Sequence, residues 1–160
     1  MKRILVVEDE QMLARIIGMK LEEEGYEVTH AYDGEQAYTL LSQPTLPDLV
    51  LLDILLPKMS GFDVLTKLHT EKLPIPKVIV FSNFAQKSDV EQAQKLGAID
   101  YIVKAAFSPA EILSKVSAVL AAADASGDPA APSPYAQFQS IQEVMPMSEV
   151  LRPGEPNNNP

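Results

Sequence analysis

Polar residues that could handle a phosphoryl group follow four separate apolar runs of this sequence. Glu8 and Asp9 come after the first run, Asp53 after the second, Ser82 after the third and Lys104 after the fourth. Clustered carboxylates repel one another, and a hard cation such as Mg²⁺, which prefers carboxylate oxygens and water, relieves that repulsion. A carboxylate can also be a nucleophile that forms an aspartyl phosphate, while an ammonium and a hydroxyl hold the phosphoryl oxygens. The residue types therefore favour phosphoryl-transfer chemistry.

Each of these residues also has an ordinary structural explanation. The residue after a strand is often polar because the chain is entering solvent. Glu8 and Asp9 could cap a following helix, whose dipole favours negative charge at its start. Ser82 could be a turn residue, and Lys104 could be a solvated surface lysine. Only the combination of complementary groups at four strand ends indicates a site.

The apolar runs alternate with segments of helical spacing, which is the pattern of βα units. We expect five strands, each followed by a helix, at residues 4–7, 26–32, 48–52, 78–81 and 99–103. Continuous apolar strands are typical of a parallel sheet with helices on both faces. Ligands bind such sheets beyond the carboxyl ends of the strands, which is where the polar residues fall.

Short local signals predict where several helices begin and end. Ser88 with Glu91, and Ser108 with Glu111, have the spacing of capping boxes. Gly25 and Gly97 stand where a left-handed residue closes a helix. Gly61 fits a close turn before the third helix.

Composition excludes several classes of function. Among the 160 residues there is no cysteine, so disulfides, thiol chemistry and cysteine-based zinc sites are excluded. The net charge of −9 and the lack of a dense basic run argue against direct nucleic-acid binding. The first apolar run is too short for a signal peptide, and no segment is long enough to span a membrane. We expect a cytoplasmic protein.

The composition changes after residue 123. Residues 124–160 hold seven of the thirteen prolines and end in PNNNP, which predicts a tail or linker behind a domain at 1–123. Within it, YAQFQSIQEVM (135–145) places apolar residues on one helical stripe. This is either residual apolar content or a short helix that folds on a partner.

Four segments together resemble the receiver domain of bacterial two-component response regulators, of the chemotaxis-regulator type. They are ILVVEDE, PDLVLLDILLPKMSG, VIVFSN and GAIDYIVK, and Asp53, Pro57 and Gly61 keep the family's Asp-x-x-x-Pro-x-x-x-Gly register. The resemblance spans the whole five-unit region. It implies a flavodoxin-like (βα)5 fold, doubly wound, with strand order 2-1-3-4-5.

The resemblance also implies roles for individual residues. Asp53 would be the phosphoacceptor, supplied by a histidine kinase or a phosphotransfer protein. Mg²⁺ would be held by Asp9 and Asp53, by Glu8 through water, and by the backbone carbonyl of Leu55. Ser82 and Lys104 would hold the phosphoryl oxygens. Tyr101 would be the switch residue, an aromatic side chain that turns inward on phosphorylation. The domain would catalyse only its own phosphotransfer and dephosphorylation.

Phosphorylation would then change a surface on the fourth helix, fifth strand and fifth helix, which would bind a downstream protein. Charged residues there could pair across a homodimer or form a solvated face; they are Lys87, Glu91, Lys95, Glu111 and Lys115.

The sequence departs from the family pattern at three places. Ala105 follows Lys104 where many receivers have proline, which predicts either a trans bond with a shifted lysine or a strained cis bond. Leu55 and Phe84 are apolar where side chains influence attack by water, which predicts slow self-hydrolysis of the phosphoryl group. Asn83 replaces a small residue and alters donor access.

The same fold could carry other functions, each of which makes its own demand on the sequence. A degenerate receiver that acts only as a scaffold is one alternative, because of Ala105. A Mg²⁺-dependent phosphatase would need a second carboxylate just after Asp53, where Ile54 and Leu55 stand. A nucleotide or flavin module would need a glycine-rich loop after the first strand, where the acidic residues stand instead. A truncated regulator with a following effector domain fits equally well.

Overall fold

The computed structural model describes residues 1–83 and 86–125, and this part of the chain forms one five-stranded parallel sheet. The strands are β1 (Arg3–Val7), β2 (Glu27–Ala31), β3 (Leu49–Leu52), β4 (Lys77–Ser82) and β5 (Asp100–Val103). Their order across the sheet is β2-β1-β3-β4-β5, and every neighbouring pair is parallel. The flavodoxin-like order expected from the sequence is confirmed.

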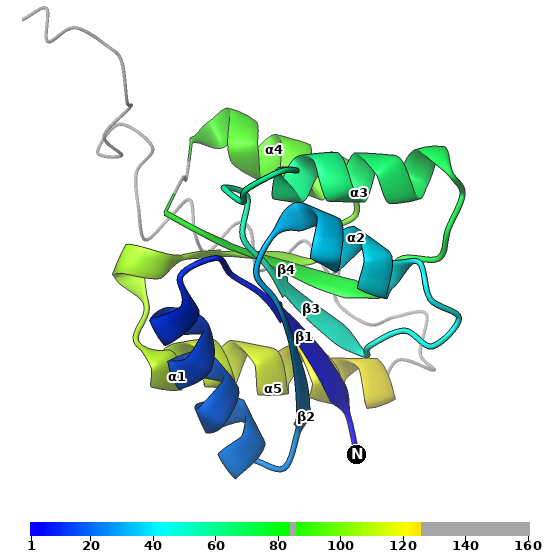
Figure 1. The fold of residues 1–160 in the computed structure, drawn as a ribbon. Coiled ribbons are helices and arrows are strands. Elements are labelled where there is room, and N and C mark those ends of the chain that lie inside the picture. The colour runs from blue at the N-terminus through cyan, green and yellow to red at the C-terminus, as the bar shows by residue number, and fades with distance from the viewer. Residues whose placement is uncertain (84–85, 126–160) are drawn as a thin grey trace, which may run out of the picture.

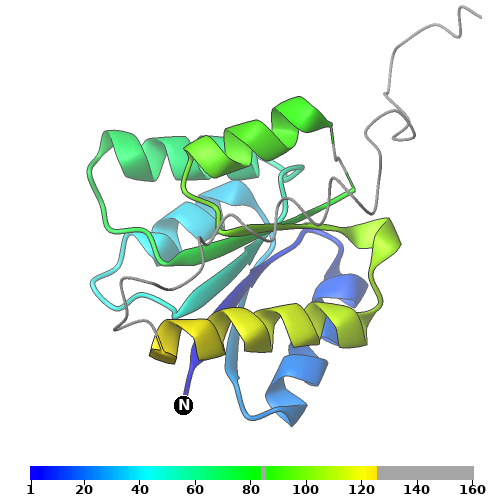
Figure 2. The same cartoon turned by 180° about the vertical axis from the view of Figure 1, so that it is seen from behind.

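Helices cover both faces of this sheet, as Figures 1 and 2 show. They are α1 (Gln11–Glu23), α2 (Gly34–Leu41), α3 (Gly61–Thr70), α4 (Lys87–Lys95) and α5 (Pro109–Ala125), with a short 3₁₀ turn η1 at Lys104–Ala106. Helices α1 and α5 lie on one face, and α2, α3 and α4 lie on the other (Figure 1). The doubly wound arrangement leaves the carboxyl ends of the strands uncovered.

The two faces of the sheet belong to two separate hydrophobic cores. Successive side chains of a strand point to opposite faces. In β1, for example, Leu5 and Val7 pack with α2, α3 and α4, whereas Ile4 and Val6 pack with α1 and α5. This double burial explains the continuous apolar runs of β1, β3 and β4, whereas the edge strand β2 alternates exposed and partly buried residues.

The structure confirms most of the helix ends predicted from the sequence and contradicts one. Gly25 and Gly97 have φ of +90° and +91°, as expected of closing residues. At α5, Glu111 accepts a hydrogen bond from the Ser108 backbone N–H at 2.6 Å, so that capping box is confirmed. The capping box predicted at Ser88 and Glu91 is wrong.

Helix α4 begins two residues earlier than the sequence predicted, because its N-cap is Gln86 and not Ser88. Lys87 is its first residue, so Ser88 is already helical, and Asp89 accepts from the Gln86 backbone N–H at 3.3 Å. Gln86 and Asp89 have the same three-residue spacing as Ser88 and Glu91 but lie two residues earlier in the chain. The backbone at Gln86 is extended. An acidic residue at either register suits the start of a helix, so spacing alone did not select one.

The predicted tail falls mostly outside the described residues. Helix α5 continues through Ala125, and the prediction of a short helix at 135–145 concerns residues that the structure does not describe. Among the described helices, none combines the length and the apolar character needed to cross a membrane.

Candidate functional site

The carboxyl ends of β1 and β3 bring three acidic side chains together. Strand pairing places Val7 beside Leu52, so the residues that follow them, Glu8 and Asp53, emerge side by side. Together with Asp9, they offer carboxylate oxygens that all lie within 4.8 Å of one another. The structure therefore assembles the acidic group that the sequence predicted.

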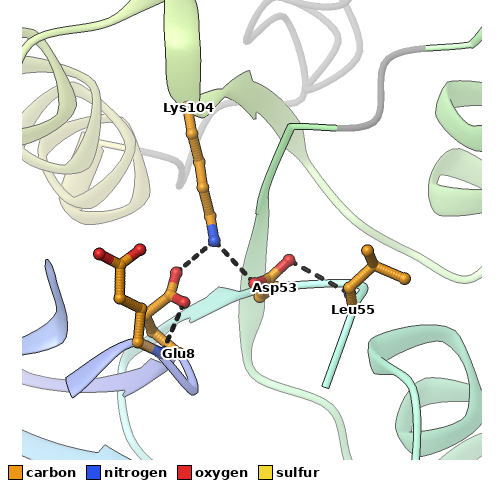
Figure 3. A network of polar contacts seen from close by, with 5 residues as sticks. Glu8, Asp53, Leu55 and Lys104 are labelled. Atoms are coloured by element: carbon orange, nitrogen blue, oxygen red, sulfur yellow. Dashed lines mark hydrogen bonds and ion pairs between the residues drawn. The ribbon is translucent and has the colours of Figure 1, made fainter. Parts of the chain in front are cut away.

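Lys104 reaches into this group from the end of β5. Its Nζ lies 2.7 Å from Asp53 Oδ2 and forms an ion pair with Glu8 (Figure 3). The side chains of Glu8, Asp53 and Lys104 are 1%, 5% and 13% exposed. One buried ammonium therefore bridges two buried carboxylates.

The Lys104–Ala105 bond decides between the two alternatives that the sequence left open. No peptide bond in the described residues is cis, so this bond is trans. The predicted shift of the lysine is nevertheless wrong, because Lys104 points at Asp53. The turn η1 redirects the backbone immediately after β5, and the long lysine side chain reaches back across the strand ends.

The site carries more negative charge than the lysine balances. Burial raises the pKa of Asp53; the hydrogen bond from Lys104 lowers that pKa, and the charge of Asp9 raises it further. Burial likewise raises the pKa of Glu8, against the lowering effect of Lys104. Burial lowers the pKa of Lys104, but the hydrogen bonds to Asp53 and Glu8 outweigh it, so the lysine pKa is raised. The group as a whole attracts a cation.

The donor set fits a hard divalent cation. Three carboxylates within one small region supply the oxygen ligands that Mg²⁺ prefers. Asp9 is exposed while Glu8 and Asp53 are buried, so water reaches one side of the group and can complete the coordination. The Leu55 backbone lies beside the same carboxylate, because its N–H donates to Asp53 Oδ1 at 3.2 Å (Figure 3).

Ser82 and Tyr101 form a second pair next to the acidic group. Both side chains are fully buried. Burial raises the pKa of Tyr101, and the charges of Asp89 and Asp53 raise it further. The Ser82 side chain lies close enough to lower that pKa in part. The tyrosine is therefore inside the domain in this structure, near the hydroxyl at the end of β4.

The structure bears differently on Asn83, on Phe84 and on two of the charged residues that the sequence placed on a possible dimer face. Asn83 is exposed, and Phe84 lies outside the described residues. Lys115, which the sequence placed on a possible dimer face, pairs with the fully buried Asp100 at 3.1 Å within the chain. Lys87 likewise pairs with Glu91 on its own helix at 3.8 Å.

Sequence reasoning missed the contacts that position the loop between β3 and α3. Asp33 and Gly34 both touch this loop. The Gly34 N–H donates to the Pro57 carbonyl at 3.2 Å, and Lys58 Nζ lies 3.4 Å from Asp33 Oδ2. No local signal marks such contacts, because the partners are more than twenty residues apart.

Solved structures place the chain in the CheY-like class of α/β proteins. A CheY-like receiver domain protein from Methanospirillum hungatei matches with a TM-score of 0.71 and 31% identity, over 79% of this chain and 99% of that one. The response regulator TrrA from Thermotoga maritima, solved in complex with Mg²⁺-BeF, matches with a TM-score of 0.63 and 35% identity, over 74% and 99%.

The family model of the response regulator receiver domain matches residues 4–117, and the chain belongs to this family. Among curated relatives, the alkaline phosphatase synthesis transcriptional regulatory protein PhoP of Bacillus subtilis is 38% identical, over 74% of this chain and 48% of PhoP. The response regulator SaeR of Staphylococcus aureus is 37% identical, over 75% and 51%. The chain thus spans about half the length of these relatives. It is a receiver domain with an acidic pocket at Glu8, Asp9 and Asp53, and not a member of a classical enzyme family.

Proposed function

We propose that Asp53 accepts a phosphoryl group from a phosphohistidine on a histidine kinase or phosphotransfer protein. The observation that carries this proposal is the position of Asp53, which lies within the three-carboxylate group and touches Lys104 at 2.7 Å. A carboxylate oxygen attacks phosphorus, a P–O bond forms, and the P–N bond breaks. The imidazole leaves and takes its proton from solvent.

In this proposal, the residues around Asp53 neutralise the negative charge of the phosphoryl group in different ways. Asp9 and Asp53, Glu8 through water, and the Leu55 backbone carbonyl would hold Mg²⁺, which supplies positive charge for the phosphoryl oxygens. Lys104 supplies a second positive charge from the opposite side. Ser82 would donate to a phosphoryl oxygen, and its movement would be passed through the neighbouring Tyr101 to α4, β5 and α5. That face would bind a downstream protein or a second copy.

The phosphodonor would dock on α1. Three of its large apolar side chains, Met12, Ile16 and Met19, are 74%, 43% and 52% exposed and follow helical spacing. The stripe begins four residues after Glu8, beside the acidic group. An exposed apolar stripe on a helix suits packing against another helix. A helical donor on this stripe would hold its phosphohistidine near Asp53.

The function is tested by treating the full chain with acetyl phosphate, with and without Mg²⁺, and measuring intact mass. We expect one phosphoryl group to be gained only with Mg²⁺, and no gain in Asp53→Asn, which preserves side-chain volume but removes the nucleophile. If the wild-type chain gains nothing under conditions that label the TrrA receiver, the chain is a scaffold and the proposal fails.

Once phosphorylated, the domain should lose its phosphoryl group slowly. Leu55 is 56% exposed beside Asp53, and its apolar side chain cannot orient an attacking water. Leu55→Asn introduces a polar group at this point and should raise the hydrolysis rate about tenfold, less than the hundredfold or more typical of a general base because an amide orients water without taking its proton. The decay of the phosphorylated mass after removal of the donor measures this, with Leu55→Met, which is apolar and similar in volume, as control. Equal decay in wild type and Leu55→Asn would contradict the prediction.

A further inference from the structure

The loop between β3 and α3 (residues 53–60) is fixed at its end by Gly61. The Gly61 N–H donates to the Ile54 carbonyl at 2.8 Å. A Cβ on Gly61 would stand 2.2 Å from the backbone oxygen of Asp53. The backbone at the end of the loop therefore lies directly against the backbone at its start.

The middle of the same loop is held by the first residues of α2. The Gly34 N–H donates to the Pro57 carbonyl, and a Cβ on Gly34 would stand 2.0 Å from the Met59 carbonyl oxygen. No side chain fits between these two backbones. Helix α2 thus touches the loop through main-chain atoms, which leaves little freedom in their relative position.

An ion pair adds to this contact at Lys58, the central residue of the loop. Lys58 has a φ of +70°, a left-handed conformation that non-glycine residues rarely adopt. Its Nζ lies 3.4 Å from Asp33 Oδ2, while Asp33 Oδ1 accepts from the Gln36 N–H at 2.8 Å. Asp33 therefore caps α2 and pairs with the loop at the same time.

We infer that Asp33, Gly34 and Lys58, here called the α2 clamp, are positioning residues for the acidic site. The loop they hold carries Leu55, whose N–H fixes Asp53 Oδ1. If the centre of the loop moves, the Leu55 backbone and the Asp53 carboxylate move with it. The clamp therefore sets the geometry offered to the cation; this metal part of the inference rests on the proposed function.

The α2 clamp can be altered by mutation without disturbing either hydrophobic core. A cleft of about 450 Å³ borders it, lined in part by His30, Glu35 and Lys58. Lys58 is 56% exposed, so shortening its side chain leaves no buried cavity. Changes at the Lys58 side chain can thus test positioning separately from packing.

The test measures amide hydrogen exchange at Leu55 and Met59 and the Mg²⁺ dissociation constant, both by NMR on the full chain. Gly34→Ala should speed exchange at these two amides and weaken Mg²⁺ binding about tenfold, as expected when groups behind metal ligands are disturbed. Lys58→Gly, which suits the backbone and removes the charge, should weaken binding about threefold, as for a partly exposed ion pair. Lys58→Arg should restore both.

Controls separate positioning from general destabilisation. Glu35→Gln removes only a 3.8 Å contact to Lys58 and should match wild type. Wild-type exchange and Mg²⁺ affinity in Gly34→Ala and Lys58→Gly would overturn the inference, as would faster exchange spread evenly over β1 and β4. If Gly34→Ala does not fold, Lys58→Gly decides alone. A wild-type chain that binds no Mg²⁺ contradicts the proposed function, while the exchange measurement still tests the clamp.

Discussion

Replacing Lys104 with methionine should lower the phosphorylation rate by roughly two orders of magnitude and yet tighten Mg²⁺ binding. The rate falls because one charge aimed at the transferring phosphoryl group is lost, and removal of a single such group typically costs this much. Affinity for Mg²⁺ rises because the ammonium that bridges Glu8 and Asp53 no longer competes for their oxygens. The structure thus predicts opposite effects of one substitution on the metal and on the chemistry.

The same variant should be less stable when Mg²⁺ is absent. Two buried carboxylates lose the ammonium that bridges them, and breaking a buried ion pair in this way costs about 3 kcal/mol. Denaturant unfolding with and without Mg²⁺ measures this cost and its recovery on addition of metal.

Lys115→Met is the matched control, because Lys115 also pairs with a buried carboxylate, Asp100, but away from the site. It should leave Mg²⁺ affinity unchanged. If Lys104→Met loses Mg²⁺ affinity together with rate, the lysine helps to assemble the metal site and does not compete with the metal.

Gly61→Ala should destabilise the domain by about 3 kcal/mol, the upper end of ordinary overpacking. The added Cβ would stand 2.2 Å from the Asp53 backbone oxygen and 3.1 Å from Ile54 Cα, and backbone cannot move aside as a flexible side chain can. The loop would have to shift, and Asp53 with it. Urea unfolding monitored by circular dichroism measures the loss.

Gly25→Ala is the comparison variant, in which alanine replaces a glycine without a steric contact. Gly25 has a φ of +90° but no atom within 4 Å of an added Cβ, so only backbone strain opposes alanine, at about 1 kcal/mol. Phosphorylation should survive in Gly25→Ala and fail in Gly61→Ala. Equal losses of stability in the two variants would show that the contact with Asp53 is not what requires glycine at 61.

The sequence was sufficient for the sheet and the acidic group because both depend on local signals. Continuous apolar runs mark strands buried on both faces, and the residue after each run, such as Asp53 or Lys104, is placed by the strand itself. Parallel strands bring those positions to one edge. The register of the α4 cap was less well determined, because acidic residues at positions 89 and 91 both suit a helix start.

Contacts between distant segments could not be read from the sequence. A left-handed φ at Lys58 carries no mark in its residue type, and its partner Asp33 lies in another loop. The Asp100–Lys115 pair is hidden for a similar reason, since an aspartate in an apolar strand and a lysine on an amphipathic helix each have ordinary explanations. The inward reach of Lys104 past Ala105 depends on the turn η1, which the sequence did not predict.

The division of the interior into two cores has a consequence for how such a domain can diverge. Neighbouring residues of β5, Tyr101 and Ile102, belong to different cores, with α4 packed on one and α5 on the other. Substitutions that share no neighbours tend to have additive effects. Substitutions in the core packed by α5 therefore need no compensating substitutions in the core packed by α4. On the face of α4, β5 and α5 proposed to bind a partner, the part formed by α5 can change while the packing around Tyr101 is kept.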